Sequence, residues 1–60
     1  MRSTEIHRKI KRNGWRLIRA EGGHYIYEKN LRAYPVPYHG AREIGKDLVK
    51  KMIREMDLVV

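Results

Sequence analysis

The stretch WRLIRAEGGHYIYEK, residues 15–29, predicts a β-hairpin. Its first part, WRLIRA, is rich in β-forming residues, and its last part, HYIYEK, is aromatic and β-branched. Between them, Glu21-Gly22-Gly23 supplies a turn, because glycine adopts backbone conformations that other residues avoid. Two antiparallel strands joined by these residues follow from the pattern.

A third extended segment is predicted next along the chain. The sequence KNLR, residues 29–32, predicts a turn around Asn30, and AYPVPYH, residues 33–39, predicts a strand. Its two prolines have no N–H to donate to a neighbour, so we expect this strand at a sheet edge or only partly paired. Three short strands joined by tight turns predict an antiparallel meander.

A short helix is predicted before the hairpin, over residues 3–13. Ser3 is a favourable N-cap, and Glu5 stands in the first turn, where the helix dipole favours an anion. Two isoleucines four residues apart mark one apolar face, and Gly14 suits the left-handed position that ends a helix. Trp15, directly after this glycine, is predicted to lie in the core.

A second helix is predicted over residues 43–56, where apolar side chains recur every four residues. Gly45 costs about 1 kcal/mol inside a helix, so we expect the regular helix to begin near it. The apolar tail DLVV, residues 57–60, is expected either to pack on the core or to form part of a contact surface.

These elements predict a single α+β domain over residues 1–60, in the order α-β-β-β-α. Each helix has one apolar stripe, so both should cover the same face of a three-stranded antiparallel sheet. This order is the topology of the double-stranded-RNA-binding domain (dsRBD), and topology alone does not establish a function.

Composition limits the function classes. Sixty residues form a thin core, since a chain of this length buries only about 60% of its unfolded surface. The chain has no cysteine, which excludes disulfides, cysteine-based zinc sites and a cysteine nucleophile. No apolar run approaches membrane-spanning length and the N-terminus is charged, so we expect a soluble, cytoplasmic protein that does not associate with a membrane.

The net charge of +7 is concentrated at one end of the chain. Residues 1–20 carry seven basic and one acidic side chain, whereas residues 21–40 carry two of each and residues 41–60 carry five and four. A localised basic field attracts polyanions, of which nucleic acid is the commonest inside cells. An acidic partner protein or an anionic membrane surface would be attracted by the same field.

His24 is the strongest candidate for chemistry, because imidazole titrates near neutrality and can move a proton either way. Gly22 and Gly23 would leave room for a phosphodiester beside its ring. The alternative is an ordinary hairpin turn followed by a surface histidine. His39 is expected to be packed or solvated, and His7 is expected to be exposed on its helix.

The histidines are too scattered in sequence to predict a metal site, and no phosphate-binding loop or serine-nucleophile motif is present. Four tyrosines share strand faces in pairs. Such rings stack on bases in single-stranded RNA recognition, but covering a small core is the more common use of tyrosine.

The ordered set NGW, GGHYIY, YPVPYHG and EIGKDLVKKMIREMDL resembles the HicA toxins of HicA–HicB toxin–antitoxin pairs over residues 4–58. This resemblance implies a dsRBD-like fold and a ribonuclease that cleaves mRNA and is neutralised by a HicB antitoxin. The family's histidine in a Gly-Ser-His motif is catalytic, so the resemblance gives that role to His24. Gly23 replaces the serine, and any contact of a serine hydroxyl is lost. No catalytic role is implied for His39.

The resemblance also implies which surface meets RNA, since dsRBD-like folds use the first helix and the start of the second. We call the five basic side chains expected there the helix cations: Arg8, Lys11, Arg12, Lys46 and Lys50. The expected partners are mRNA and a HicB-like antitoxin, with no small-molecule cofactor and no metal. The alternatives are a non-catalytic RNA-binding module of the same fold and a small protein that docks an acidic partner.

Overall fold

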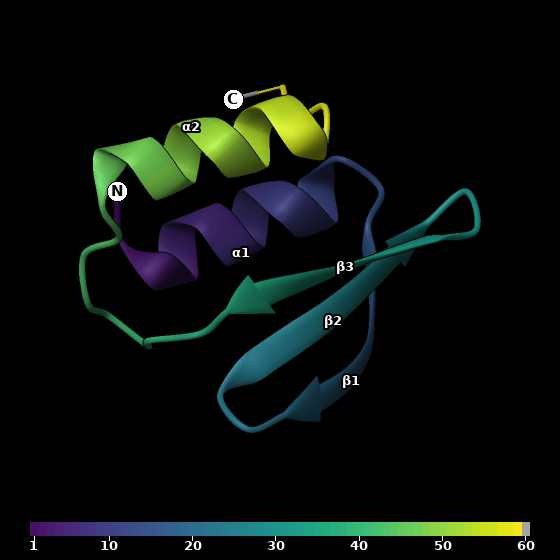
Figure 1. Cartoon of the computed structure of the whole chain (residues 1–60), viewed down its shortest axis with the longest axis horizontal. Helices are drawn as coiled ribbons and strands as arrows, with labels where there is room; N and C mark the ends of the chain where they lie inside the picture. The colour runs from purple at the N-terminus through teal and green to yellow at the C-terminus, as the bar shows by residue number, and fades with distance from the viewer. Residues whose placement is uncertain (60) are drawn as a thin grey trace.

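The computed structural model describes residues 1–59 and confirms the predicted order α-β-β-β-α (Figure 1). Two helices flank a continuous run of three strands. The elements are α1 (Ser3–Arg12), β1 (Arg16–Glu21), β2 (His24–Lys29), β3 (Arg32–Pro37) and α2 (Lys46–Glu55). Within residues 1–59, neither helix has the length and apolar character needed to cross a bilayer.

The three strands form an antiparallel sheet in the order β1-β2-β3. The proline-containing β3 lies at an edge, as predicted, and its full length pairs with β2. The turn between β2 and β3 consists of Asn30 and Leu31, both at positive φ (51° and 65°), which suits the twist of a tight hairpin. In β1, pairing skips Ile18, so this edge strand carries a bulge that the sequence did not predict.

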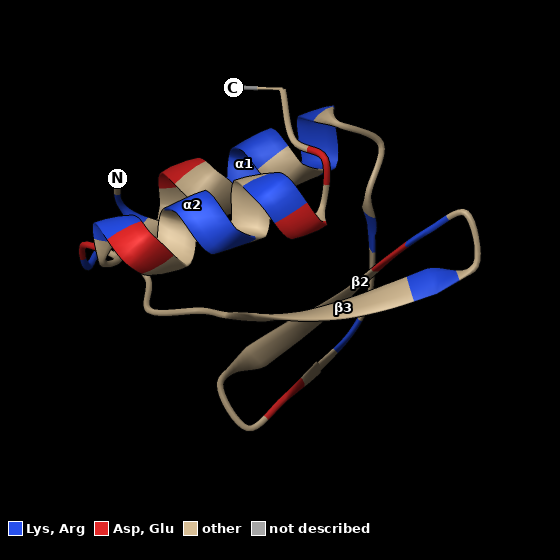
Figure 2. Ribbon diagram, turned by 45° about the horizontal axis from the view of Figure 1, so that its top comes forward, with Lys and Arg blue, Asp and Glu red and all other residues tan. Residues whose placement is uncertain are grey.

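Both helices lie on the same side of the sheet, which gives the two layers expected from the sequence (Figures 1 and 2). The core lies between the layers and draws on both helices, on β2 and β3, and on the segments that join them. Its buried apolar residues are Ile6, Ile10, Trp15, Tyr27, Val36, Ile44, Val49, Met52, Met56 and Leu58. The prediction that Trp15 is buried is confirmed, and its indole N–H donates to the carbonyl of Met56 at 3.2 Å.

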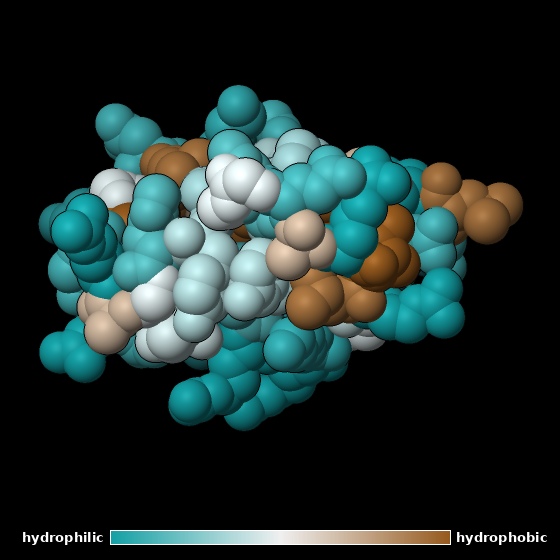
Figure 3. All heavy atoms as spheres, turned by 90° about the horizontal axis from the view of Figure 1, so that it is seen from below, coloured by the Kyte–Doolittle hydropathy of each residue, from teal (hydrophilic) through white to brown (hydrophobic). Residues whose placement is uncertain are grey.

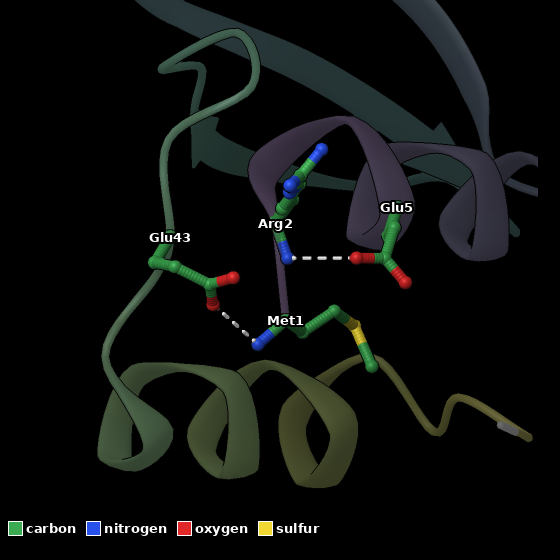
Figure 4. Close-up of polar contacts among 4 residues, drawn as sticks. All are labelled: Met1, Arg2, Glu5 and Glu43. Carbon is green, nitrogen blue, oxygen red and sulfur yellow. Dashed lines mark hydrogen bonds and ion pairs between the residues drawn. The ribbon is translucent and has the colours of Figure 1, made fainter.

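The start of α1 differs from the prediction. The N-cap is Arg2, not Ser3, and its backbone N–H donates to the carboxylate of Glu5 at 3.2 Å (Figure 4). Ser3 is the first helical residue and is fully buried. The N-terminal ammonium group pairs with Glu43 at 2.9 Å, which ties the chain start to the segment before α2.

The second helix begins at Lys46, next to Gly45, which confirms the predicted start, and Gly45 is its N-cap. Of the apolar residues that recur every four positions, Leu48 is 37% exposed, and the buried members are Ile44, Met52 and Met56. Val49, which broadens this face, is also buried. In the tail, Leu58 packs on the core and Val59 is 81% exposed. Val60, the last residue of the predicted apolar tail, lies outside the described residues.

Candidate functional site

His24 is the first residue of β2 and follows a turn made of two glycines. Gly22 and Gly23 have φ of 50° and 82°, values that side-chain-bearing residues rarely adopt. No heavy atom lies within 4 Å of the position that a Cβ would take at either glycine, leaving aside chain neighbours. The turn is therefore bordered by open space, and His24 itself is exposed.

The ring of His24 belongs to the sheet face that the helices do not cover. Tyr27 is fully buried beneath the helices, and side chains alternate along a strand, so the odd-numbered residues of β2 face the core. His24 and Ile26 therefore face outward. Directly across from His24 lie Glu21 on β1 and Pro37 on β3.

Two arginines of β1 share this outward sheet face. Arg19 lies opposite Ile26 and pairs with Glu21 at 3.2 Å, and Arg16 lies opposite Glu28 and pairs with it at 3.0 Å. Neither arginine was among the site residues predicted from the sequence. Counting alternate residues back from the glycine turn reaches Arg19, but the bulge at Ile18 shifts this count before Arg16.

The exposed apolar side chains of the two hairpins are Leu17, Ile18 and Leu31. Figure 3 shows the molecule from below relative to Figure 1, and on the face turned to the viewer apolar atoms lie among hydrophilic ones.

His7 is buried, and the expectation that it is exposed was wrong. Only 5% of its surface is accessible, because it lies on the same side of α1 as Ile6 and Ile10. Its Nε2 lies 2.9 Å from the carbonyl oxygen of Pro37, and its Nδ1 lies 2.6 Å from the hydroxyl of Tyr27. A carbonyl oxygen only accepts, so Nε2 carries the hydrogen, and in the neutral ring Nδ1 accepts from the Tyr27 hydroxyl.

Aromatic rings surround His7. The rings of Tyr25 and Tyr38 stack in parallel at 4.5 Å, and each meets the His7 ring edge-on at 5.3 and 5.1 Å. Burial lowers the pKa of His7, and nearby Lys11 lowers this pKa further, while the bond to Pro37 opposes the shift. Burial, with the neighbouring tyrosines, raises the pKa of Tyr27 to about 12.

The tyrosines thus serve mainly to cover the core. Tyr27 is fully buried, Tyr25 and Tyr34 are half-buried, and Tyr38 is 36% exposed. The hydroxyl of Tyr34 donates to the Glu55 carboxylate at 2.6 Å. The interpretation as core tyrosines is therefore confirmed for Tyr25, Tyr27 and Tyr34. Tyr38 is exposed and offers the most ring surface to a ligand.

His39 lies in the loop that closes over the start of α1. Its backbone N–H donates to the Ser3 hydroxyl at 3.0 Å, while its side chain is exposed. In the same loop, the carbonyls of Arg42 and Gly40 accept from the N–H groups of Ser3 and Thr4. The first N–H groups of the helix are therefore already bonded. In the part of the chain from residue 1 to residue 59, no three His, Cys, Asp or Glu side chains are grouped to hold a metal ion.

All five helix cations are exposed, and their role in RNA binding stays a prediction. Lys and Arg are distributed along both helices in Figure 2. One hollow of about 110 Å³ lies on α1 and is lined by Glu5, Arg8, Lys9 and Arg12. The helix cations belong to the helical layer, whereas His24 faces out from the sheet, so the fold does not gather them around the His24 ring.

Comparisons with known proteins identify the family. A family model described as "HicA toxin of bacterial toxin-antitoxin" matches residues 3–58. The chain is also 29% identical over 58 residues to a probable mRNA interferase HicA of Pseudomonas fluorescens (strain Pf0-1), a match that covers 97% of each sequence. No solved structure matches the chain. Since the family match spans nearly the whole described chain, the protein belongs to the HicA toxin family.

Proposed function

We propose that this protein is the toxin of a type II toxin–antitoxin pair and acts as an endoribonuclease on mRNA in the cytoplasm, with His24 as its catalytic acid or base. Membership of the HicA family and the relative named as a probable mRNA interferase support the reaction class. One observation carries the choice of residue. His24 is exposed beside an open glycine turn, at the position of the histidine that the family resemblance implicates.

The reaction proposed is attack of a ribose 2′-oxygen on the adjacent phosphorus. A base takes the 2′-OH proton as the 2′-O–P bond forms, and an acid gives a proton to the departing 5′-oxygen as its bond to phosphorus breaks. The product is a 2′,3′-cyclic phosphate, and no cofactor or metal is required. General acid–base catalysis by a positioned side chain contributes about 10²–10⁴-fold.

Arg19 is the cation best placed to assist at the phosphate. It lies on the same outward face of the sheet as His24 and pairs with Glu21, which is directly across from His24. A guanidinium can bind two phosphate oxygens at once, so Arg19 can exchange its bond to Glu21 for a bond to the scissile phosphate. The helix cations bind flanking phosphates of a longer RNA.

The first test compares the wild type with His24→Ala on a labelled RNA, with folding checked by the fluorescence of Trp15. We expect His24→Ala to bind RNA normally but to lose cleavage. A matched oligonucleotide with a 2′-deoxy sugar at the cleaved position should resist the wild-type enzyme. Cleavage of this oligonucleotide at the normal rate would exclude the 2′-oxygen mechanism, and full activity of His24→Ala would exclude His24.

A second variant, His39→Ala, removes the other exposed imidazole. If His39 supplies the second proton transfer, its loss lowers the cleavage rate by about 10²-fold or more. If the rate is unchanged, the second group is another side chain or water. If neither the wild type nor any variant cleaves RNA but all retain it on filters, the protein is an RNA-binding module.

The proposed partner is a HicB-like antitoxin with an acidic toxin-binding surface. A net charge of +7 in a chain of 60 residues favours such a surface, chiefly through faster association. Tyr38 and the exposed Val59 at the tail are candidate contacts in the interface.

A further inference from the structure

We infer that His7, a buried histidine of α1, is a positioning residue for His24. His7 binds the Pro37 carbonyl and so fixes the end of β3, and the start of β2, where His24 lies, is aligned on that end. The inference rests on the proposed catalytic role of His24. No resemblance or motif in the sequence pointed to His7.

His7 makes two hydrogen bonds that connect α1 to the sheet. Its ring links α1 to two different strands, with Nε2–H donating to Pro37 at the end of β3 and Nδ1 accepting from Tyr27 in β2. The His7 ring is 5% exposed and Tyr27 is fully buried, whereas Pro37 and its bond to His7 are partly buried. A carbonyl that is shielded on one side and loses its donor is left without a partner there, so the bond to Pro37 constrains where β3 ends.

Pro37 is in turn connected to the backbone around His24. Pro37 is the residue directly across from His24, and the following N–H, of Tyr38, donates to the Gly23 carbonyl at 2.9 Å. The ring of Tyr38 also stacks on Tyr25, the residue after His24. The backbone on both sides of His24 is therefore aligned on residues 37 and 38.

The alignment by β3 matters because His24 has little other support. The two residues before His24 are glycines in open space, so the turn itself gives the ring little support. β1 pairs with His24 through Glu21, but all six of its residues are exposed, whereas Val36 and Pro37 at the end of β3 are buried and partly buried. The contacts from the end of β3 are then the firmest constraint on the His24 backbone, and His7 anchors them. A displacement of about 1 Å at a catalytic group can cost roughly 10²-fold in rate.

A matched pair of substitutions separates positioning from general support of the core. In His7→Gln the amide nitrogen is as many bonds from Cα as Nε2, so it can still donate to Pro37. In His7→Asn the amide nitrogen corresponds to Nδ1 and falls short of Pro37. Tyr27→Phe completes the set, because it removes the other bond of His7 and leaves the bond to Pro37 in place.

Each variant is assayed for RNA cleavage under conditions where Trp15 fluorescence shows it to be folded. We expect His7→Asn to lower kcat between about tenfold and a hundredfold with KM unchanged, and His7→Gln to restore most of the loss. Tyr27→Phe should lower stability and keep kcat. The inference would be overturned if the two His7 variants had equal kcat. It would also be overturned if Tyr27→Phe lowered kcat as much as His7→Asn does when both variants are equally folded.

Amide hydrogen exchange of Tyr38 gives a readout that does not depend on catalysis. Its N–H, bonded to Gly23, should exchange faster in His7→Asn than in the wild type or His7→Gln. If His24→Ala proves fully active, the proposed function fails while this exchange pattern can still hold. If exchange at Tyr38 is the same in all variants, the positioning role of His7 fails whatever the activity of His24.

Discussion

Lowering the pH below 6.5 should destabilise this protein through protonation of His7. The ring is buried between α1 and the sheet and is surrounded by Tyr25, Tyr27 and Tyr38. Among the described residues its hydrogen-bond partners are a phenol and a carbonyl, and no carboxylate is among them. Burial, assisted by nearby Lys11, lowers its pKa in the folded state from the ordinary value of 6.5.

The sign follows from proton counting. Because the folded-state pKa of His7 is lower than the unfolded value, the unfolded chain binds more protons as the pH falls below 6.5. The contribution of neutral His7 is therefore fully present above pH 6.5 and is lost as the pH falls through the folded-state pKa. Between the two pKa values, one proton changes the free energy of unfolding by at most about 1.4 kcal/mol per pH unit.

This slope is large for so small a protein. At about 0.05–0.15 kcal/mol per residue, a chain of 60 residues has a total stability of roughly 3–9 kcal/mol. The assay is urea unfolding followed by the fluorescence of Trp15, which is 4% exposed, at several pH values from 7.5 down to about 5. Staying above that pH avoids the titration of Glu43, whose pKa is lowered by its bond to the N-terminal ammonium group.

The control is His7→Gln, which keeps a neutral donor to Pro37 at every pH. We expect the free energy of unfolding of the wild type to fall between pH 6.5 and 5. The fall should be smaller in the variant, because the variant lacks the proton that His7 takes up on unfolding. Parallel pH curves for the two proteins would refute the reasoning, because the slope would then come from other groups.

Three further predictions concern RNA, the core and the antitoxin. Neutralising any three helix cations should reduce the slope of log affinity against log salt by about 2–3, because each lost phosphate contact lowers this slope by about 0.7–0.9. The slope is measured by filter binding at several salt concentrations. An unchanged slope would show that these residues do not contact RNA. Trp15→Phe removes the indole N–H that binds the Met56 carbonyl and should lower the free energy of unfolding by about 1–3 kcal/mol in urea titrations followed by circular dichroism, whereas an unaltered midpoint would contradict that role. A purified HicB-like partner should displace labelled RNA, and a ternary complex that cleaves normally would argue against blocking of His24.

Most of the fold could be predicted from the sequence because local patterns agree with it. The period of the apolar residues predicted both helices, the two glycines predicted the hairpin, and the prolines of β3 predicted its edge position, all of which the structure confirms. The buried position of Trp15 was likewise predicted from its place directly after Gly14.

The errors lie where contacts distant in sequence decide the outcome. His7 sits one residue after Ile6 and three before Ile10, at helical spacing for the buried face, but it was treated as polar and therefore as exposed. Its bonds to Tyr27 and Pro37, 20 and 30 residues away, make that burial possible. Ser3 was predicted as the N-cap from the intrinsic preference of serine. In the structure Ser3 is the first helical residue, and its backbone N–H donates to the carbonyl of Arg42 in the loop before α2.

The arrangement of the candidate site could be predicted only in part. The glycine turn and exposed His24 follow from the local sequence, and alternation back from the turn places Arg19 on the same face. The outward position of Arg16 could not be predicted, because it depends on the bulge at Ile18, which has no local sequence signal. The role of His24 stays a prediction until cleavage is measured.

The separation of His24 from the helix cations bears on how an antitoxin can silence the protein. A domain of 60 residues has little surface to spare, which favours an inhibitor that covers the basic surface and His24 together. His24 instead faces outward from the sheet, and the helix cations lie on the layer that covers the opposite sheet face. An acidic surface that binds the helix cations would weaken the binding of long RNA and leave His24 open, so competition with long RNA does not reveal which face is covered. A dinucleotide substrate, too short to depend on the helix cations, distinguishes the two cases: its cleavage persists in the complex if the antitoxin covers only the helices and stops if it covers the sheet.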